Sequence, residues 1–419
     1  MESRKDASPE APKSTQPTLA CQRRPCSRPL FLQRFPRMQH RVATLGGMSA
    51  RDHLPARLLL GPGPSNVSPR VLAAMAQPLV GHLDPVFLGI LDDVQQRLMR
   101  LFETTNPFTL PLSATGSAGM EACLVNLLEQ GDEIVVGIAG VFGTRMCEVA
   151  ERAGARVTRV AAEPGTALDP AAMRDAIVRV RPRVVAFVHA ETSTGVLQPV
   201  EDIAAAAHEV DALVVLDCVT SLAGLPLRLD AWGIDAAYSG TQKCLSCPPG
   251  LSPVSFSEPA LEHVRKRRTR VQSWYLDVTL LAGYYGTGQR VYHHTAPISA
   301  ILGLAEGLRI VEEEGLAARV RRHRAAADLL VKELEPLGFV PLVEPAFRLP
   351  PLTTLELPAS IVDVGEAGVR AALLDRHGIE VGAGLGPLAG RIWRIGLMGE
   401  NARPESVEAL VAALRSELG

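Results

Sequence analysis

Short runs of apolar residues alternate with amphipathic segments through the middle of the chain. The runs, rich in Val, Ile and Leu, lie at 134–138, 157–160, 184–188 and 213–216. Apolar residues at helical spacing occupy the segments between them, most clearly at 169–180 and 200–210. Continuous apolar strands are typical of a mainly parallel sheet that helices cover on both faces. The pattern therefore predicts an α/β fold built from repeated strand–helix–strand units.

Near residue 299 the pattern changes to long helices with few strands between them. Helices are predicted at 299–314, 316–337 and 404–418, and short strands at 352–357 and 392–395. This change predicts a second, smaller α+β domain. We place the large domain at 51–312 and the small C-terminal domain at 313–419, with residues 1–50 outside both.

Residues 1–50 differ from the rest of the chain in composition. They contain seven Arg and two Lys against three acidic residues, with Ser and Pro throughout and no sustained periodicity. Such a segment buries too little apolar surface to order itself, so we predict a disordered basic leader. It is either an organellar targeting segment or sequence ahead of a later start at Met38 or Met48, and the second interpretation is favoured.

The overall composition favours a globular protein that works on small molecules. Hydrophobic residues make up 47% of the chain and charged residues 21%, as in ordinary folded domains. A formal net charge of -2 provides no basic field for nucleic acid or anionic lipid. Charged or turn residues interrupt every apolar run before it reaches the length of a membrane span. We expect no nucleic-acid or membrane partner and a cytoplasmic location, with organellar targeting by the leader left open.

Cysteines and histidines form two patterns that resemble metal sites. Seven cysteines, an odd number spread along the chain, indicate reduced thiols rather than disulfides. Cys244 and Cys247 form a C-x-x-C pair, but no second pair stands at the spacing of a zinc site. His293 and His294 are adjacent, and on a strand such neighbours point to opposite faces. No metal is expected at either place.

Lysine is rare in this chain: five lysines stand against 38 arginines, and two of the five lie in the leader. Lys266, within the basic run 265–270, and Lys332, in a helical pattern, are expected to be solvated surface charges. Lys243 instead follows the small-residue turn 239–242 after a strand-like stretch. Because arginine cannot replace lysine in amine chemistry, a lysine kept in such a turn indicates that chemistry. A stray surface lysine is the alternative on this residue alone.

Two further features match amine chemistry. Asp217 stands at the carboxyl end of the run 213–216, where open α/β sheets bind ligands, and it would suit a cationic ring nitrogen. A cap of the following turn is the ordinary alternative for Asp217. The small residues 113–119 lead into a helical pattern at 120–129, and free N–H groups at a helix start bind phosphate. Together, an amine, a carboxylate and a phosphate cradle are what a pyridoxal phosphate (PLP) enzyme requires.

From about residue 58 to the C-terminus, the chain resembles the class V aminotransferases of PLP fold type I, specifically the alanine–glyoxylate and serine–glyoxylate group. Five ordered motifs carry the resemblance: LGPGPSN at 60–66, ETSTG at 191–195, SGTQK at 239–243, YHHT at 292–295 and WRIG at 393–396. The resemblance implies a mainly parallel sheet of the seven-stranded type between helices, with a smaller C-terminal α+β domain. It also implies PLP as the cofactor and a homodimer whose subunits share the cofactor site.

The resemblance further implies roles for residues at matching positions. Lys243 would bind the PLP aldehyde as a Schiff base and carry the proton, and Asp217 would keep the pyridine nitrogen protonated. Arg394 would grip the substrate carboxylate through two parallel hydrogen bonds. Gly61 and His82 would line the substrate pocket. The other cofactor contacts would come from Thr115, Gly116, Ser117, Phe142, Thr192 and Gln242, with Tyr292 and Thr295 reaching the phosphate of the other subunit.

The expected reaction is ping-pong transfer of the amino group of alanine or serine to glyoxylate. Phe142 departs from relatives that stack tryptophan on the cofactor ring, because phenylalanine lacks the indole N–H donor. Ureidoglycine is an alternative donor, although relatives of that kind tend to carry Gln in place of His82 and Asn in place of Trp274. A cysteine desulfurase or related lyase, or a silent PLP-binding protein, is less favoured.

Overall fold

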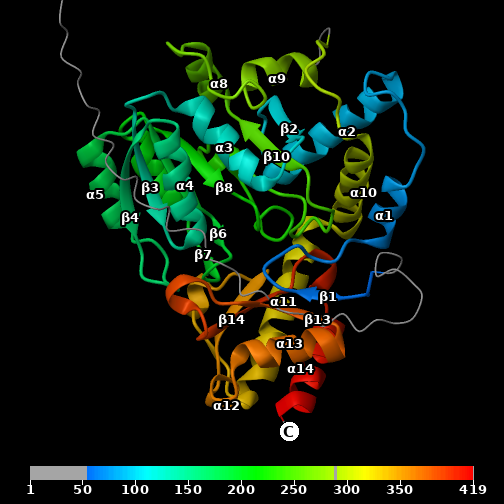
Figure 1. Cartoon of the computed structure of the whole chain (residues 1–419). Coiled ribbons are helices and arrows are strands. Elements are labelled where there is room, and N and C mark those ends of the chain that lie inside the picture. Colours follow the sequence, from blue (N-terminus) through cyan, green and yellow to red (C-terminus); the bar gives the residue numbers. More distant parts are fainter. Residues whose placement is uncertain (1–53, 287–289, 419) are drawn as a thin grey trace, which may run out of the picture. The chain divides into compact units, whose positions relative to one another are not determined.

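The computed structural model describes residues 54–286 and 290–418, and its larger sheet has seven strands in the order β2-β10-β9-β8-β5-β3-β4. Strands β4, β3, β5, β8 and β9 are parallel, and β10 is antiparallel to both of its neighbours. Their bounds are β2 (Phe108–Leu112), β3 (Glu133–Ile138), β4 (Arg156–Ala161), β5 (Val184–Val188), β8 (Leu213–Asp217), β9 (Ala236–Tyr238) and β10 (Ser252–Phe256). The predicted mainly parallel α/β sheet is confirmed (Figure 1).

Burial differs between the centre and the edge of this sheet. The predicted strands 134–138, 184–188 and 213–216 are confirmed as β3, β5 and β8, and β5 is buried along its whole length. The strand predicted at 157–160 is confirmed as β4, but several of its residues are exposed. Burial on both faces is therefore wrong for β4, which is the edge strand and is hydrogen-bonded in this sheet to β3 alone.

Helices cover both faces of the large sheet. The crossovers from β3 to β4 and from β4 to β5 run in opposite directions, and right-handed connections then place α4 (Val141–Arg152) and α5 (Pro170–Val180) on opposite faces. Helix α3 (Gly116–Leu127) packs beside α4, and α6 (Glu201–His208) packs beside α5. The remaining helices of this part are α1 (Pro69–Met75), α2 (Pro85–Phe102), α7 (Leu229–Trp232), α8 (Glu258–Arg265) and α9 (Val278–Tyr285).

The predicted helices of this part are present with adjusted ends. Those predicted at 169–180 and 200–210 are confirmed as α5 and α6. The helix predicted at 120–129 begins already at Gly116, because the small residues that precede it form its first turn. A short hairpin of β6 (Ala190–Glu191) and β7 (Val196–Leu197) follows β5.

The smaller sheet is mixed, with the order β1-β13-β14-β12-β11. Its strands are β1 (Leu58–Leu60), β11 (Val340–Pro341), β12 (Leu352–Glu356), β13 (Ile379–Ala383) and β14 (Ile392–Gly396). Strand β1 pairs in parallel with β13, and the other pairs are antiparallel. A segment at the start of the predicted large domain thus adds a strand to the smaller sheet, and the boundaries 51–312 and 313–419 stay a prediction.

Long helices follow residue 298, and those predicted at 299–314, 316–337 and 404–418 are confirmed as α10 (Ile298–Glu314), α11 (Leu316–Leu334) and α14 (Pro404–Leu418). Helix α10 packs against α1 and α2, whereas α11 and α14 contribute to the core of the smaller sheet. Helix α13 (Glu366–His377) and the single turn α12 (Ala359–Val362) were not predicted. The helix predicted at 316–337 ends at Leu334, because Pro336 cannot continue the α-helical bonding and Glu335–Leu337 forms a 3-10 turn. Further 3-10 turns lie at Pro345–Phe347, Gly386–Leu388 and Gly399–Asn401.

Each sheet has its own apolar core. The larger core surrounds the seven-stranded sheet and includes the fully buried Phe87, Phe187 and Phe256. The smaller core is built around Trp393 on β14, whose ring centroid lies 5.8 Å from that of Phe339. Both sheets are therefore rigid supports for residues at their edges, since large buried side chains resist displacement.

Candidate active site

The candidate residues gather at the carboxyl edge of the seven-stranded sheet. Strand β8 ends at Asp217, β9 is followed by the turn that carries Lys243, and β5 is followed by the hairpin around Thr192. Strand β2 runs in the same direction as these strands, so α3 also begins at this edge. Parallel strands thus bring residues that are distant in sequence to one edge of the sheet, where open α/β sheets usually bind ligands.

Lys243 is buried, with 7% of the residue exposed, whereas Lys266 and Lys332 are exposed as predicted. Its Nζ atom donates a hydrogen bond to the carbonyl oxygen of Pro62. Gly63 has φ +108°, and a Cβ atom added there would lie 2.6 Å from Nζ, so only glycine lets the backbone approach the amine. Burial lowers the pKa of Lys243 to about 8, so a fraction of the amine is uncharged near neutral pH.

Asp217 is 2% exposed and interacts electrostatically with Lys243. Its Oδ2 atom accepts a hydrogen bond of 2.6 Å from the Tyr238 hydroxyl, and its Oδ1 atom accepts one of 2.8 Å from the Val219 N–H. Burial raises the pKa of Asp217 to about 6, although both hydrogen bonds favour the charged form. The carboxylate is therefore charged at neutral pH and is suited to accept a hydrogen bond from a cationic ring nitrogen.

Glu191 and Tyr238 belong to the site although sequence reasoning missed them. Glu191 is fully buried, and its Oε1 atom accepts from the Ser193 hydroxyl at 2.6 Å. Its Oε2 atom accepts from the Phe142 N–H at 3.2 Å, and burial raises the pKa of the carboxyl. Both residues stand at or just beyond a strand end, so the rule that identified Asp217 could have found them too.

Arg394 reaches the site from the centre of the smaller sheet, on β14. It is 7% exposed, and its Nε atom donates to the Ala383 carbonyl at 2.7 Å while Nη1 donates to the Thr192 carbonyl at 3.2 Å. Burial lowers the pKa of Arg394 to about 10, so the guanidinium keeps its charge. Gly61 lies close to the same strand, because a Cβ added at Gly396 would lie 2.1 Å from the Gly61 carbonyl oxygen.

The predicted phosphate cradle lies at the start of α3. Thr115 and Ser117 are exposed and Gly116 is buried, and Thr115 makes no side-chain capping bond. The N–H groups of Gly116 and Ser117 have no hydrogen-bond partner among the described residues, as is usual in the first turn of a helix. The lysine turn lies beside it, since a Cβ added at Gly116 would lie 3.3 Å from the Ser239 carbonyl oxygen. The Oε1 atom of Gln242 is buried and has no hydrogen-bond partner among the residues described. The Gln242 amide is thus available to a ligand at this place.

The ring of Phe142 stands at the start of α4, next to the anion cradle. The guanidinium of Arg145 lies 5.1 Å from the centre of that ring and donates to the Ser117 hydroxyl at 3.4 Å. The residues at this edge fit PLP, because the Lys243 amine suits its aldehyde, the Asp217 carboxylate its ring nitrogen, and the start of α3 its phosphate.

His82, Trp274, Tyr292, His293 and His294 form a second cluster, which we call the histidine group. The Trp274 and His293 rings stack at 4.4 Å, and the His82 and Tyr292 ring centres lie 5.5 Å apart. Trp274 is 62% exposed and Tyr292 is 60% exposed. The Nε2 atoms of His82 and His293 are buried without a hydrogen-bond partner among the residues described. Thr295, close by in sequence, is exposed.

The arrangement predicted for His293 and His294 is wrong. Both residues lie in an irregular segment rather than on a strand, so their side chains do not alternate between faces. Their Nδ1 atoms lie 2.8 Å apart, and the Nε2 atom of His294 contacts the Ser113 hydroxyl at 2.8 Å. Within residues 54–286 and 290–418, no cluster of three or more His, Cys, Asp or Glu side chains could hold a metal ion.

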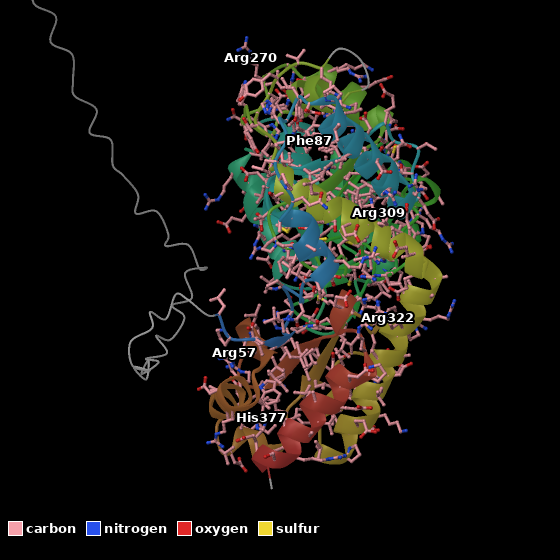
Figure 2. All side chains as sticks on the ribbon, turned by 90° about the vertical axis from the view of Figure 1, so that its right-hand side faces the viewer. Arg57, Phe87, Arg270, Arg309, Arg322 and His377 are labelled. Atoms are coloured by element: carbon pink, nitrogen blue, oxygen red, sulfur yellow. The ribbon has the colours of Figure 1, made fainter. Side chains whose placement is uncertain are left out.

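Other residues singled out from the sequence lie apart from this chemistry. The cysteines of the described segments are free and buried: Cys123, Cys147, Cys218, Cys244 and Cys247. Cys21, Cys26 and the leader 1–50 lie outside the described residues. In the basic run, Arg265 pairs with Glu258, and Arg270 projects from the surface (Figure 2). In the part of the chain that is described, no helix combines the length and hydropathy of a membrane crossing.

An open α/β sheet with a buried amine, a strand-end carboxylate and an anion cradle at one edge is the arrangement of an enzyme that processes amino groups on a phosphorylated cofactor. Comparison with known proteins gives the family. The chain belongs to the class-V aminotransferase family, whose model matches residues 58–393. Its fold is that of the fold type I aminotransferases, as the resemblance implied.

Similar proteins cover most of the chain. The alanine–glyoxylate aminotransferase of Callithrix jacchus is 41% identical over 368 residues, which are 87% of this chain and 88% of that protein. The (S)-ureidoglycine–glyoxylate transaminase of Bacillus subtilis is 38% identical over 391 residues, covering 88% of this chain and 93% of that protein. The crystal structure of an alanine–glyoxylate aminotransferase from Nostoc sp. shares 46% identity with a TM-score of 0.86, covering 89% of this chain and 98% of that chain.

Proposed function

We propose that this chain is a PLP-dependent transaminase that moves the amino group of alanine or serine to glyoxylate. The observation that carries the proposal is the meeting of a buried amine, Lys243, with a buried carboxylate, Asp217, and a buried guanidinium, Arg394. The names of the similar proteins from Callithrix jacchus and Nostoc support alanine and glyoxylate as substrates.

Bound PLP would supply an aromatic ring that accepts the electrons left on the Cα atom when an attached amino acid loses its proton. Lys243 would hold the cofactor covalently until the substrate amine displaces it, and the released amine, with a pKa of about 8, would accept and return that proton. Asp217 would hold the proton on the ring nitrogen, since its charged form is oriented by Tyr238 and Val219. The rest of the cofactor would lie against Thr115, Gly116, Ser117, Phe142, Thr192 and Gln242.

Arg394 is the proposed anchor for the substrate carboxylate. Carbonyl oxygens of Ala383 and Thr192 hold its Nε and Nη1 atoms, so the planar fork keeps one orientation toward the site. A carboxylate bound there brings the substrate amine toward Lys243, and holding reactants in such geometry supplies much of the rate enhancement. Gly61 and His82 are proposed to line the pocket around the substrate side chain.

The proposed enzyme is a homodimer in which each subunit completes the other's site. Tyr292 and Thr295 are exposed in the single chain, where they are free to reach the phosphate cradle of a second copy. Exposed apolar side chains accompany them at Leu79, Leu83, Val86 and Val291, with between 48% and 67% of each residue exposed. The His82 and Tyr292 rings lie 5.5 Å apart, so the two stretches that carry these apolar residues lie close together in space, and such clusters favour a protein–protein interface.

The test combines trapping of the cofactor with a panel of amino donors. Protein loaded with PLP is reduced with borohydride, and peptide mass spectrometry is expected to locate the cofactor on Lys243. Lys243→Ala is expected to lose the trapped cofactor and about 10³-fold or more in turnover of alanine with glyoxylate. Lys332→Ala removes an exposed lysine and is the matched control, with both readouts unchanged.

The donor panel separates the alternatives. Alanine, serine and ureidoglycine are compared with glyoxylate as the acceptor, and alanine or serine is expected to react fastest. A faster half-reaction with ureidoglycine would assign the activity named for the Bacillus subtilis relative instead. Conversion of none of the donors by protein that binds PLP would contradict the proposal and favour a silent binding protein.

A desulfurase or related lyase needs a reactive thiol near the cofactor, and the thiols beside the lysine are unsuited to that role. Cys244 is fully buried and Cys247 is 2% exposed. Burial raises the pKa of both thiols to about 12, so neither is a thiolate at neutral pH. Release of sulfide from cysteine at a rate that matches transamination would overturn this judgement.

A further inference from the structure

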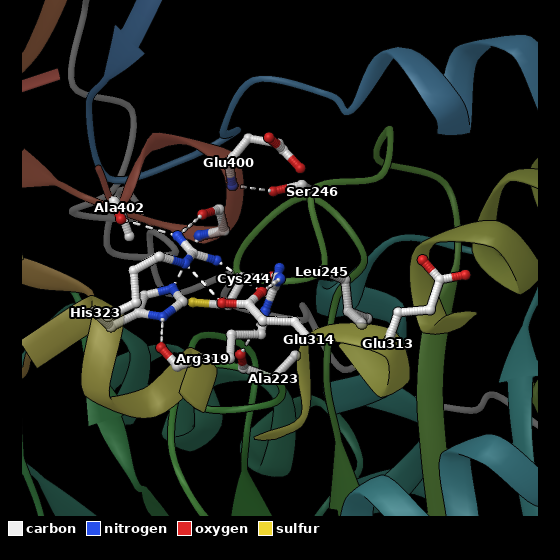
Figure 3. A network of polar contacts seen from close by, with 12 residues as sticks. Ala223, Cys244, Leu245, Ser246, Glu313, Glu314, Arg319, His323, Glu400 and Ala402 are labelled. Carbon is white, nitrogen blue, oxygen red and sulfur yellow. Dashed lines mark hydrogen bonds and ion pairs between the residues drawn. The ribbon is translucent and has the colours of Figure 1, made fainter. Parts of the chain in front are cut away.

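A carboxylate and two arginines form an ion-pair network where α10 ends and α11 begins (Figure 3). Glu314 is the last residue of α10, and it accepts hydrogen bonds from Arg319 at 2.6 Å and from Arg322 at 2.7 and 2.9 Å. Burial acts to raise the pKa of Glu314, but the hydrogen bonds from Arg322 and Arg319 lower it to about 2. The network therefore keeps its charges, although Arg319 is only 2% exposed.

Arg319 connects this network to the loop that carries the lysine. Its Nη2 atom donates to the carbonyl oxygen of Cys244 at 2.6 Å, and Cys244 directly follows Lys243. Its Nε atom donates to the carbonyl oxygen of Ala223 at 3.1 Å, in the turn that follows Asp217. One guanidinium thus holds the backbone directly after the amine and the turn that follows the carboxylate of the proposed site.

Arg322 and His323 connect the same network to the loop that follows Arg394. Arg322 donates to the carbonyl oxygens of Gly399 at 2.8 Å and Ala402 at 2.9 Å. The Nε2 atom of His323 accepts from the Gly399 N–H at 2.9 Å, so its Nδ1 atom carries the proton and donates to the Arg319 carbonyl. Burial lowers the pKa of His323 to about 3, which keeps the ring neutral.

The two loops also interlock directly. The Glu400 N–H donates to the Ser246 hydroxyl at 2.8 Å, and a Cβ added at Gly399 would lie 1.9 Å from that oxygen. Ser246 has φ +51°, a left-handed conformation that costs energy for a residue other than glycine unless its surroundings hold it. The loop after Lys243 therefore keeps its shape through contacts with the loop after β14.

Stability alone is a weak reason for such a network. Apolar side chains of similar volume often stabilise a fold as well as buried ion pairs do, because the ions lose their hydration. Apolar side chains, however, cannot hold particular carbonyl oxygens at hydrogen-bond distance. Here the arginines donate to backbone carbonyls directly after Lys243, in the turn that follows Asp217, and in the loop that follows Arg394. These three residues are carried by two different sheets.

We propose that Arg319 and Arg322, held together by Glu314, are positioning residues that fix the Lys243 amine relative to the Arg394 guanidinium. Through them, α11 sets the spacing between the group that would hold the cofactor and the group that would hold the substrate carboxylate. This inference rests on the proposed function. It adds a role for residues that touch neither cofactor nor substrate.

The test is Arg319→Met in the PLP-loaded enzyme, with a readout that a purely structural role would not move. The pH titration of the visible absorbance of lysine-bound PLP, recorded without any donor, is expected to shift its midpoint by about half a pH unit or more, because Asp217, Glu191 and Arg394 act on the Lys243 amine. In turnover, kcat is expected to fall about 10- to 100-fold while KM for alanine changes less.

Arg267→Met is the matched control, since Arg267 also donates to two backbone carbonyls, those of Asn126 and Leu128, at 2.8 and 2.7 Å. It is expected to lower the melting temperature without moving the titration midpoint or kcat. Equal effects of both substitutions on midpoint and kcat would overturn the proposal. If Arg319→Met does not fold, Glu314→Gln replaces it, and a shift of the titration midpoint and a fall in kcat are again expected. An unchanged midpoint would contradict the proposal.

The two proposals fail in different ways. A wild-type enzyme that binds PLP on Lys243 but transfers no amino group from alanine contradicts the proposed function. The titration midpoint still decides the role of Arg319 in that case, because it needs no donor. A wild-type protein without PLP on Lys243 overturns both.

Discussion

Two regions differ in how many of their polar groups find hydrogen-bond partners within one chain. They are the amine site, made of Lys243, Asp217, Glu191 and Arg394, and the histidine group. Each polar side chain of the amine site has a hydrogen-bond partner, such as Pro62 for the lysine. In the histidine group, by contrast, two buried ring nitrogens have no partner among the residues described, and Trp274 and Tyr292 are mostly exposed.

This difference indicates what each region needs. Buried polar groups are nearly always hydrogen-bonded in finished structures, so nitrogens without a partner among the described residues, beside exposed aromatic rings, favour a partner molecule for this cluster. In the proposed homodimer, a second subunit would cover the rings and bring polar atoms to them. The four residues of the amine site are paired within one chain, although the phosphate cradle beside them would receive Tyr292 and Thr295 from the second subunit.

The largest effect is expected where the amine site is broken at its carboxylate. Asp217→Asn should lower kcat by about 10²- to 10³-fold, because a neutral amide cannot hold a proton on the ring nitrogen. Single-turnover kinetics with alanine would measure it. Asp235→Asn is the matched control, since Asp235 is also buried and bonded to the Val214 N–H at 2.9 Å, and it should change kcat little. An equal loss of kcat in Asp217→Asn and Asp235→Asn would indicate a structural role for Asp217.

Arg394→Gln is expected to have the next largest effect. Loss of the guanidinium should lower kcat/KM for alanine by about 100-fold, because the substrate carboxylate loses its charged partner. An amine without a carboxylate, such as ethylamine, should react at an unchanged rate, which separates anchoring from general damage. Arg391→Gln is the control, because Arg391 is exposed and directly precedes β14. A parallel loss for both amines would refute the anchoring role.

The role of the histidine group is tested at Tyr292, which is expected to act across the interface of the proposed dimer. Tyr292→Ala should weaken PLP retention about 10-fold, since the phosphate loses a hydroxyl donor and the dimer loses a contact. Tyr292→Ala chains are then mixed with Lys243→Ala chains. If Tyr292 acts on the partner's site, one site of each mixed dimer contains Lys243 from the first chain and Tyr292 from the second. Recovery of PLP binding on mixing is the expected result. Without recovery, Tyr292 would not act on a partner's site.

The smallest effect is a shift in pH dependence. Tyr238→Phe removes a hydrogen bond that favours charged Asp217, so the pKa of Asp217 should rise from about 6 by about one unit. The carboxylate is then lost at a higher pH as the solution is acidified. The acid limb of the kcat profile should move toward pH 7, with no change at pH 8. An unmoved acid limb would show that Asp217 does not control it.

Much of the fold follows from local patterns. Continuous Val, Ile and Leu runs correctly predicted β3, β5 and β8, because central parallel strands bury both faces. Lys243 was found through the scarcity of lysine, and Asp217 through its place at a strand end. The structure places both at the same edge of the sheet, while their chemical roles stay a prediction.

Other features depend on contacts between distant segments, which local patterns do not contain. Strand β1 joins the smaller sheet because β13 pairs with it, and nothing near residue 58 indicates that partner. Arg319 and Arg322 look like ordinary helix-surface arginines, yet their donors reach the backbone of loops far away in sequence. The contact between the Nδ1 atoms of His293 and His294 arises in an irregular segment, for which no periodic rule applies.

The pairing of β1 with β13 has a consequence for folding during synthesis on the ribosome. Residues 58–60 form an edge strand whose hydrogen-bonded neighbour in the sheet, Ile379–Ala383, is made near the end of translation. At about 5 to 20 residues per second, the early strand waits tens of seconds for its neighbour. The apolar segment Leu58–Leu60 therefore remains without its partner strand through most of synthesis. A truncated chain without the last fifty residues would lack β13 and β14, so β1 would have no strand to pair with.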